Sequence, residues 1–221
     1  MSGKPQARLY TFVDTAYLQG RSLSEVTKGL CEGGSDLIQL RAKDKDSDWI
    51  RSAASDMHSI TRAHSIPLVI NDHFDIACEL GAEYCHLGQE DFFDEMGLRH
   101  VDQLPWPDPK DPCRPRIGLS THAPDQAQRA VDAGADYVAI GPVYATGTKP
   151  TARPVTLDYV RWAEENVRIP WFAIGGINEE TLDPVVEAGA SGICIVSAIL
   201  NSPDLREACQ SFKGRLVSAL S

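Results

Sequence analysis

Eight short apolar runs, separated by segments with a helical pattern, constrain what this chain can fold into. Runs of this length and composition are typical of parallel strands that are buried on both faces. They lie at residues 9–13, 37–40, 67–70, 84–87, 117–120, 137–140, 171–174 and 193–196. Helical patterns lie at 22–32, 47–64, 74–80, 125–133, 157–166 and 179–188, and from about 203 toward the C-terminus. Strands that alternate with helices in this number predict an α/β fold, the (β/α)8 TIM barrel.

The length of the chain fits one domain of this kind. It has 221 residues, of which 43% are hydrophobic, and barrels of roughly 200–250 residues form as single domains. We therefore expect residues 1–221 to be one TIM-barrel domain. A proline-rich stretch at about 104–115 contains Pro105, Pro107, Pro109, Pro112 and Pro115. These prolines rule out a helix there, and we interpret the stretch as a surface excursion.

Charge and cysteine usage limit the partners and the compartment. The formal net charge is -10 and the pI is near 5.0, whereas nucleic acids and anionic membranes require a basic face. We therefore expect small-molecule substrates, no nucleic acid and no membrane, and we leave homo-oligomerisation open. Six cysteines without a C-x-x-C pair argue against a zinc site or a disulfide framework. No long apolar run or apolar leader is present, so we predict a cytoplasmic protein.

One motif recurs at the predicted turns from helix to strand, and it indicates which end of the barrel carries the chemistry. Residues 79–84, 132–137 and 187–192 each combine a helix end, a glycine and the entry to a strand. Such αβ turns lie at the end of a barrel that serves stability, and catalytic groups lie at the opposite end. The candidate site residues are therefore those that follow each strand.

Two aspartates follow neighbouring strands at that end. Asp72 follows the run at 67–70, and Asp91 follows the run at 84–87. Mg²⁺ is commonly bound through one or two carboxylates, with water and substrate phosphates completing its coordination. Arg41, Lys43 and Lys149 lie on the same rim and could neutralise a diphosphate. The sequence thus predicts that Mg²⁺ and a diphosphate are bound at this rim.

A second phosphate pocket is predicted beside it. Gly175 and Gly176 follow the seventh run, and Val196 and Ser197 follow the eighth. In TIM barrels, backbone N–H groups after strands seven and eight frequently bind a phosphate.

Each of these residues also has a purely structural interpretation. Asp72 and Asp91 could cap a helix or a turn, and Arg41 and Lys43 could be solvated loop charges. Thr146, Thr148 and the two glycines could simply form turns. His86 could be a core histidine, and we assign His58, His64, His73, His100 and His122 to surface or capping positions.

The rim residues, taken together, resemble the thiamine phosphate synthase family. The matching segments run in order along the chain: 38–43 (IQLRAK), 69–72 (VIND), 86–91 (HLGQED), 118–122 (GLSTH), 136–144 (DYVAIGPVY), 146–149 (TGTK), 174–177 (IGGI) and 196–199 (VSAI). The resemblance implies a transferase of thiamine biosynthesis. It would join 4-amino-5-hydroxymethyl-2-methylpyrimidine diphosphate to 4-methyl-5-(2-hydroxyethyl)thiazole phosphate, giving thiamine phosphate and diphosphate by Mg²⁺-assisted dissociative substitution.

The resemblance also implies a role for each rim residue. Asp72 and Asp91 would bind the cofactor Mg²⁺, and Arg41, Ser120 and Lys149 would act in catalysis. The pyrimidine diphosphate would be held by Gln39, Arg41, Lys43, Asn71, Ser120 and Lys149, with His86 near the pyrimidine. The thiazole phosphate would be held by Thr146, Thr148, Gly176, Val196 and Ser197. Leu40, Ala42 and Gly147 are further expected substrate contacts.

Two other functions fit the same fold. The first is a thiazole tautomerase-like isomerase, which would need neither the second acid nor the cations for a diphosphate. The second is a non-catalytic thiamine phosphate binding protein, which the fold by itself does not exclude. Diphosphate release from the two substrates would distinguish the synthase from both.

Overall fold

The strands form a closed parallel barrel in a computed structural model that describes residues 7–146 and 154–219. Each strand pairs with the next along the chain, and the last pairs with the first. The strands are β1 (Leu9–Asp14), β2 (Leu37–Arg41), β3 (Leu68–Asn71), β4 (Tyr84–Leu87), β5 (Arg116–Thr121), β6 (Tyr137–Ile140), β7 (Trp171–Ile174) and β8 (Ile193–Ile195). This closed parallel barrel confirms the predicted fold class.

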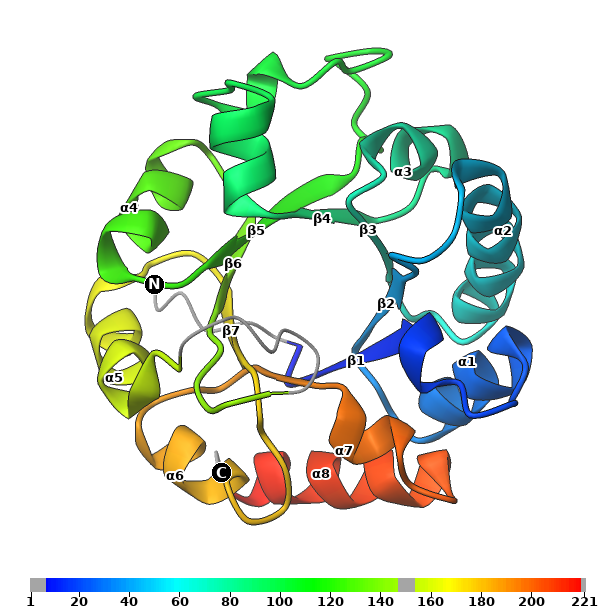
Figure 1. Cartoon of the computed structure of the whole chain (residues 1–221), viewed down its shortest axis with the longest axis vertical. Coiled ribbons are helices and arrows are strands. Elements are labelled where there is room, and N and C mark those ends of the chain that lie inside the picture. The colour runs from blue at the N-terminus through cyan, green and yellow to red at the C-terminus, as the bar shows by residue number, and fades with distance from the viewer. Residues whose placement is uncertain (1–6, 147–153, 220–221) are drawn as a thin grey trace.

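Helices surround the barrel, as Figure 1 shows. Asp46 caps α2 by accepting a hydrogen bond from the Trp49 N–H at 2.9 Å. Ser22 and Glu25 form a capping box at the start of α1. The helices are α1 (Leu23–Glu32), α2 (Ser47–Ala63), α3 (Phe74–Leu80), α4 (Pro124–Asp132), α5 (Thr156–Asn166), α6 (Leu182–Glu187), α7 (Ser197–Leu200) and α8 (Leu205–Ala219). Among the described residues, none of these helices combines the length and apolar character needed to cross a membrane.

The recurring turn between helix and strand takes the expected backbone conformation. Gly81, Gly134 and Gly189 have φ values of 61°, 81° and 108°. Side chains disfavour this left-handed region, and glycine adopts it without a steric penalty. The three turns end α3, α4 and α6 and lead into the next strands.

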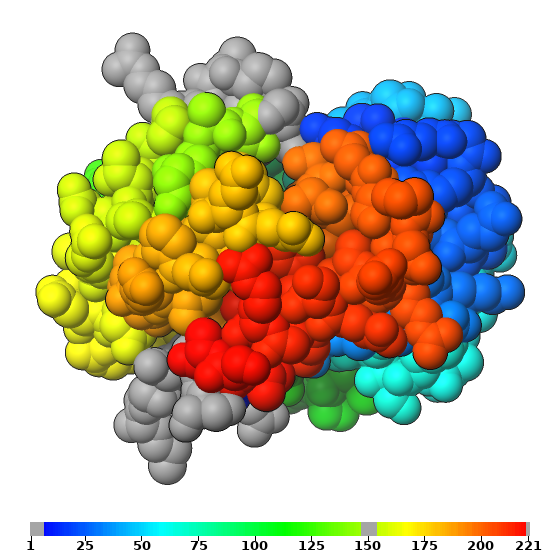
Figure 2. Space-filling model, turned by 90° about the horizontal axis from the view of Figure 1, so that it is seen from below, coloured from blue at the N-terminus to red at the C-terminus, as the bar shows by residue number. Residues whose placement is uncertain are grey.

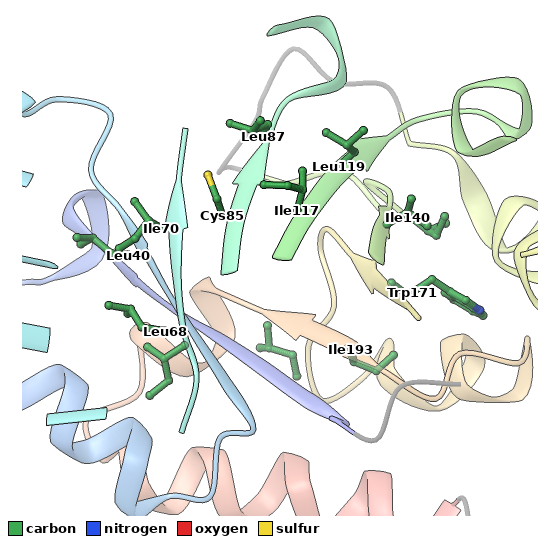
Figure 3. Packing of buried hydrophobic residues seen from close by; sticks show 14 of the residues in the cluster. Leu40, Leu68, Ile70, Cys85, Leu87, Ile117, Leu119, Ile140, Trp171 and Ile193 are labelled. Atoms are coloured by element: carbon green, nitrogen blue, oxygen red, sulfur yellow. The ribbon is translucent and has the colours of Figure 1, made fainter. Parts of the chain in front are cut away.

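The core has two layers because successive side chains of a strand point to opposite faces. The outer layer lies between the strands and the helices, and Figure 3 shows Leu40, Leu68, Ile70 and other members of this cluster. The inner layer fills the barrel with Tyr10, Phe12, Leu37, Val69, Tyr137, Phe172 and Cys194. Gly118 makes room for this inner layer, since a Cβ there would lie 2.0 Å from Tyr137 Cζ.

The segment between β4 and β5 replaces a regular helix and lies outside the barrel (Figure 1). It contains the π-helical turn η2 (Asp91–Glu95) and the 3-10 turn η3 (Val101–Gln103). The proline-rich stretch is not exposed throughout, because Trp106 is buried within it. The Trp106 ring meets Phe74 edge to face at 4.8 Å, and its Nε1 donates to the Val101 carbonyl.

Asp36, directly before β2, links the first strand to the last helix. The Asp36 carboxylate accepts hydrogen bonds from the N–H groups of Arg8 and Leu9 at 2.8 and 2.9 Å, and it also pairs with Lys213 of α8. Helix α8 packs on α1, and Figure 2 shows the red C-terminal helix close to the blue N-terminal part. One side chain therefore links β1, β2 and the last helix.

Candidate active site

A cavity of about 240 Å³ opens at the carboxyl ends of the strands. Most of the predicted site residues line it, although they come from all parts of the chain. Those that line it are Gln39, Arg41, Lys43, Asn71, Asp72, His86, Asp91, Ser120, Thr146, Gly176, Val196 and Ser197. The cavity therefore brings together residues that the sequence placed at one rim.

Two predicted residues that the structure describes do not line the cavity. Leu40 and Ala42 are buried in the outer layer of the core, because they alternate with Gln39, Arg41 and Lys43 along β2 and its extension. Their side chains do not face the cavity, so any contact that they make with a ligand would be through the backbone. Gly147, Thr148 and Lys149 lie outside the described residues.

Asp72 directs its carboxylate to Lys43 and not to the following helix. Its Oδ2 lies 2.9 Å from Lys43 Nζ, and α3 has His73 at its N-cap without a side-chain cap. The capping interpretation of Asp72 is therefore wrong. Asp72 has a φ of 66°, a conformation that is costly for a residue with a side chain. Its N–H donates to the His86 carbonyl at 2.9 Å, which helps to hold the backbone in this conformation.

Asp91 begins η2 and folds back over the end of β4. A Cβ on Gly88 would lie 2.3 Å from Asp91 Oδ2, so only glycine leaves space for this carboxylate. Asp91 and Asp72 line the same cavity, and Glu90 lines it as well. In the part of the chain that the structure describes, no three His, Cys, Asp or Glu side chains come together as a metal site. A pair of carboxylates still fits Mg²⁺ when phosphate oxygens and water supply the remaining ligands.

Arg41 is held by a buried acid. Its Nη1 lies 2.7 Å from Asp14 Oδ2, and the Asp14 side chain is 1% exposed, compared with 15% for Arg41. The other carboxylate oxygen of Asp14 accepts the Ala16 N–H at 3.0 Å. Arg41 is therefore not a freely solvated loop charge, because Asp14 orients its guanidinium at the wall of the cavity.

Ser120, on β5, carries a buried hydroxyl at the cavity. Among the residues that the structure describes, its Oγ has no hydrogen-bond partner, although the residue lines the cavity. The next residue differs, since Thr121 Oγ1 contacts the Ala139 carbonyl and the Tyr159 hydroxyl at 2.9 and 2.7 Å. Buried polar atoms are normally satisfied, so the Ser120 hydroxyl is a candidate ligand contact.

The two glycines after β7 support the loop that carries Thr146. A Cβ on Gly176 would lie 2.7 Å from the Ala145 carbonyl oxygen, and one on Gly175 would lie 2.4 Å from Pro142 Cβ. The Tyr144 N–H also donates to the Gly175 carbonyl at 3.0 Å. This close approach brings Thr146 to the same cavity as Gly176, and Val196 and Ser197 line it from the start of α7.

Several cavity residues escaped the sequence analysis. Tyr10 and Phe12 line the cavity from β1, and Glu90 lines it beside Asp91. His122 also lines it, with Nδ1 against the Gly141 carbonyl, so its assignment to a surface or capping position was wrong. Outside the cavity, His58 is buried and not at the surface, whereas His100 caps η3 as predicted. Aromatic residues in a strand look like ordinary core residues in the sequence, so nothing there distinguished Tyr10 or Phe12.

Comparison with known proteins places this site in a family. A family model described as "Thiamine monophosphate synthase" matches residues 9–199, which is most of the chain. The chain belongs to the thiamine monophosphate synthase family. The resemblance of its rim segments to this family is thereby confirmed.

Individual members of the thiamine monophosphate synthase family agree over most of their length. The chain is 41% identical over 191 residues to "Thiamine-phosphate synthase" of Thermus thermophilus, covering 86% of this chain and 87% of the relative. It is 36% identical to the protein of that name from Lawsonia intracellularis, covering 96% and 94%. A solved structure, "Thiamine phosphate pyrophosphorylase" from Pyrococcus furiosus, superimposes with a TM-score of 0.83 at 27% identity, covering 97% and 98%.

Proposed function

We propose that this protein is a transferase that joins 4-amino-5-hydroxymethyl-2-methylpyrimidine diphosphate to 4-methyl-5-(2-hydroxyethyl)thiazole phosphate. The bond between the pyrimidine methylene carbon and the diphosphate oxygen breaks, and the thiazole nitrogen forms a new bond to that carbon. The products are thiamine phosphate and diphosphate. The observation that carries the proposal is that one cavity brings together the carboxylates of Asp72 and Asp91, the cationic side chains of Arg41 and Lys43, and a Gly-Gly turn, in a chain that belongs to the synthase family.

The charged residues suit the leaving diphosphate. Arg41, Lys43 and the proposed contact Lys149 would neutralise its oxygens, and the unpartnered Ser120 Oγ would donate a hydrogen bond. Charge stabilisation that is already in place before the bond breaks is the largest contribution that such a site makes to catalysis. No nucleophilic side chain takes part, because the thiazole nitrogen is the nucleophile.

Asp72 and Asp91 would hold Mg²⁺ at this site. When bound, the ion stabilises the negative charge that develops on the departing diphosphate. The donor chemistry fits, since carboxylate oxygens are the ligands that Mg²⁺ prefers. Lys43 lies 2.9 Å from Asp72 and would move its ammonium group from that carboxylate to the diphosphate when the substrate binds.

The second substrate would bind on the opposite side of the cavity. Gly176, Val196 and Ser197 line it there, where barrels of this type commonly bind phosphate. Thr146 lies on the same side, and Gly147 and Thr148 follow it in sequence. Gln39, Asn71 and His86 would contact the pyrimidine. Holding both reactants in one cavity lowers the entropic cost of bringing them together.

We further propose that residues 1–221 act as a single domain in the cytoplasm. All six cysteines are free, which suits a reducing compartment. The isomerase and the non-catalytic binding protein have no support among the relatives reported above, which carry the name of the synthase.

Turnover tests the proposal directly. The purified protein is mixed with both substrates and Mg²⁺, and diphosphate and thiamine phosphate are measured together. We expect them to form in equal amounts, and only when both substrates are present. A folded protein that binds the substrates but releases no diphosphate would contradict the proposal.

A further inference from the structure

A continuous chain of hydrogen bonds crosses the barrel below the cavity. It joins five side chains from five strands: His86 Nδ1 to Tyr137 Oη at 3.0 Å, Tyr137 Oη to Tyr10 Oη at 3.1 Å, Tyr10 Oη to Gln39 Oε1 at 2.5 Å, and Gln39 Nε2 to Asn71 Oδ1 at 2.8 Å. Both ends of the chain, His86 and Asn71, line the cavity. The two tyrosine hydroxyls thus connect groups that face the ligand.

The register of the strands explains how this chain forms. Asn71 lies opposite His86, His86 opposite Gly118, and Gly118 opposite Tyr137. Because Gly118 has no side chain, Tyr137 reaches across β5 to His86. Their rings stack with a centroid distance of 5.6 Å. Gly118 is therefore what brings the phenol and the imidazole into contact.

The two hydroxyls keep their protons. Tyr10 and Tyr137 are both fully buried, and this burial raises the pKa of each phenol well above its usual value. Neighbouring rings also hold Tyr10 in place, with Phe12 stacked on it at 5.2 Å and Phe172 edge to face at 5.3 Å. Each hydroxyl therefore contributes one hydrogen to the chain, in a fixed position.

Counting those hydrogens gives the chain a direction. The Gln39 amide oxygen only accepts, so Tyr10 donates its hydrogen to Gln39 Oε1. Tyr10 Oη must then accept from Tyr137, whose hydrogen is used in that bond. Tyr137 Oη must in turn accept, so its partner His86 Nδ1 carries a hydrogen. At the other end, Gln39 donates to Asn71 Oδ1, which leaves the Asn71 NH₂ group as the donor.

We propose that Tyr10 and Tyr137 are positioning residues that hold His86 in its Nδ1–H tautomer and fix the orientation of the Asn71 amide. In this tautomer, His86 Nε2 carries the lone pair and accepts hydrogen bonds. Asn71, which lies opposite His86 on the neighbouring strand β3, offers its NH₂ group as a donor. Within the described ranges, 7–146 and 154–219, Asn71 Nδ2 donates no hydrogen bond, whereas Asn71 Oδ1 accepts one from Gln39.

This pattern matches one chemical group. A 4-aminopyrimidine carries an amino group that donates beside a ring nitrogen that accepts, whereas its 4-oxo counterpart has a ring N–H beside an oxygen and reverses both roles. A site that is built to pair with a hydrogen-bonding group rejects an analogue that leaves its buried groups unpaired. The chain would thus make the cavity selective for the amino form, an inference that rests on the proposed function.

The tautomer itself is tested by ¹⁵N NMR of the imidazole at a pH where His86 is neutral, with its signals assigned from His86→Asn. We expect the Nδ1–H form in the wild-type protein and a shift toward the Nε2–H form in Tyr137→Phe. Tyr84→Phe is the matched control, because Tyr84 packs on Tyr137 but its hydroxyl bonds Arg116 at 3.0 Å. An Nε2–H form in the wild-type protein overturns the inference whether or not the variants fold.

Selectivity is tested by calorimetry with 4-amino-5-hydroxymethyl-2-methylpyrimidine and its 4-oxo counterpart. We expect the wild-type protein to prefer the amino form, and Tyr137→Phe and Tyr10→Phe to lose about tenfold or more of that preference. KM for the pyrimidine diphosphate should rise in both variants, with KM for the thiazole phosphate unchanged. Equal preference in wild type and both variants would contradict the inference.

The two proposals fail in different ways. If turnover is normal but His86 is in the Nε2–H form, the positioning inference is wrong and the synthase function stands. If His86 is in the Nδ1–H form but neither pyrimidine binds, the hydrogen-bonded chain stands, whereas the selectivity inference and the synthase function are both contradicted.

Discussion

The Arg41 guanidinium is bound to the buried carboxylate of Asp14, with 2.7 Å between Nη1 and Oδ2. The two residues lie opposite each other on β1 and β2. An arginine that contacts a diphosphate must be held in a defined direction, and Asp14 supplies the group that holds it.

We predict that Asp14→Asn lowers both stability and turnover. The amide keeps an oxygen for the Ala16 N–H but loses the charge that compensates Arg41, so the free energy of unfolding should fall by about 1–3 kcal/mol. Urea unfolding and diphosphate release measure the two effects. Asp44→Asn is the control, because that carboxylate is exposed and its ion pair with Lys45 is screened by solvent. Wild-type values in Asp14→Asn would show that Arg41 does not depend on Asp14.

We predict that Asp91→Ala leaves the fold intact and weakens the dependence of turnover on Mg²⁺. The variant would lose one of the two carboxylates proposed to bind the ion, so a higher Mg²⁺ concentration should be required for half-maximal rate. Asp94→Ala is the matched control, because Asp94 lies in the same turn but is exposed and does not line the cavity. Unchanged rates at limiting Mg²⁺ in Asp91→Ala would contradict the role of Asp91.

Ser120 and Thr121 should respond in opposite ways to removal of their hydroxyls. Ser120→Ala removes a buried group that has no hydrogen-bond partner within residues 7–146 and 154–219, so stability should be unchanged or slightly higher while KM for the pyrimidine diphosphate rises. Thr121→Val removes two hydrogen bonds at a fully buried position and should cost about 1–3 kcal/mol. Thermal unfolding and steady-state kinetics separate the two. A large loss of stability in Ser120→Ala would mean that its hydroxyl is structural.

Alkaline pH should destabilise the protein through its buried thiols. Burial raises the pKa of Cys31 to about 11 and that of Cys209 to about 12, whereas a thiol in an unfolded chain has a pKa of about 8.5. The folded state therefore holds these protons more tightly, and the associated stability is complete below about pH 8.5 and is lost as pH rises through 11 to 12.

Urea unfolding across that range measures the effect. The Cys31→Ala/Cys209→Ala double variant should show a shallower decline in the free energy of unfolding than the wild-type protein. Below pH 8.5, a thiol reagent should label the exposed Cys113 well before Cys31 and Cys209. A decline of equal slope in both proteins would assign the alkaline sensitivity to other groups.

The sequence predicted the strands well and some helices less well. The expected helix at 179–188 is shorter, because the Asn178 side chain accepts the N–H groups of Glu180 and Thr181 and forms a turn before α6. Helix α7 was missed, since its four residues (Ser197–Leu200) are too few to show a helical period.

Some residues of the candidate site could be identified from their local sequence, whereas others depend on contacts between strands. Asp72, Asp91 and Lys43 could be identified because polar residues directly follow apolar runs. The contact of Tyr137 with His86 could not, because it depends on register across three strands and on the space above Gly118. Register between strands is a property of the assembled barrel, and no segment of the chain specifies it alone.

The pairing of β8 with β1 has a consequence for biosynthesis. Strand β1 leaves the ribosome well before β8, and it keeps one edge open until residues 193–195 have been made, about 180 residues later. During translation that edge offers unpaired N–H and C=O groups to any extended polypeptide nearby. Chaperone dependence of this protein should therefore be concentrated in nascent chains that have not yet reached the last strand.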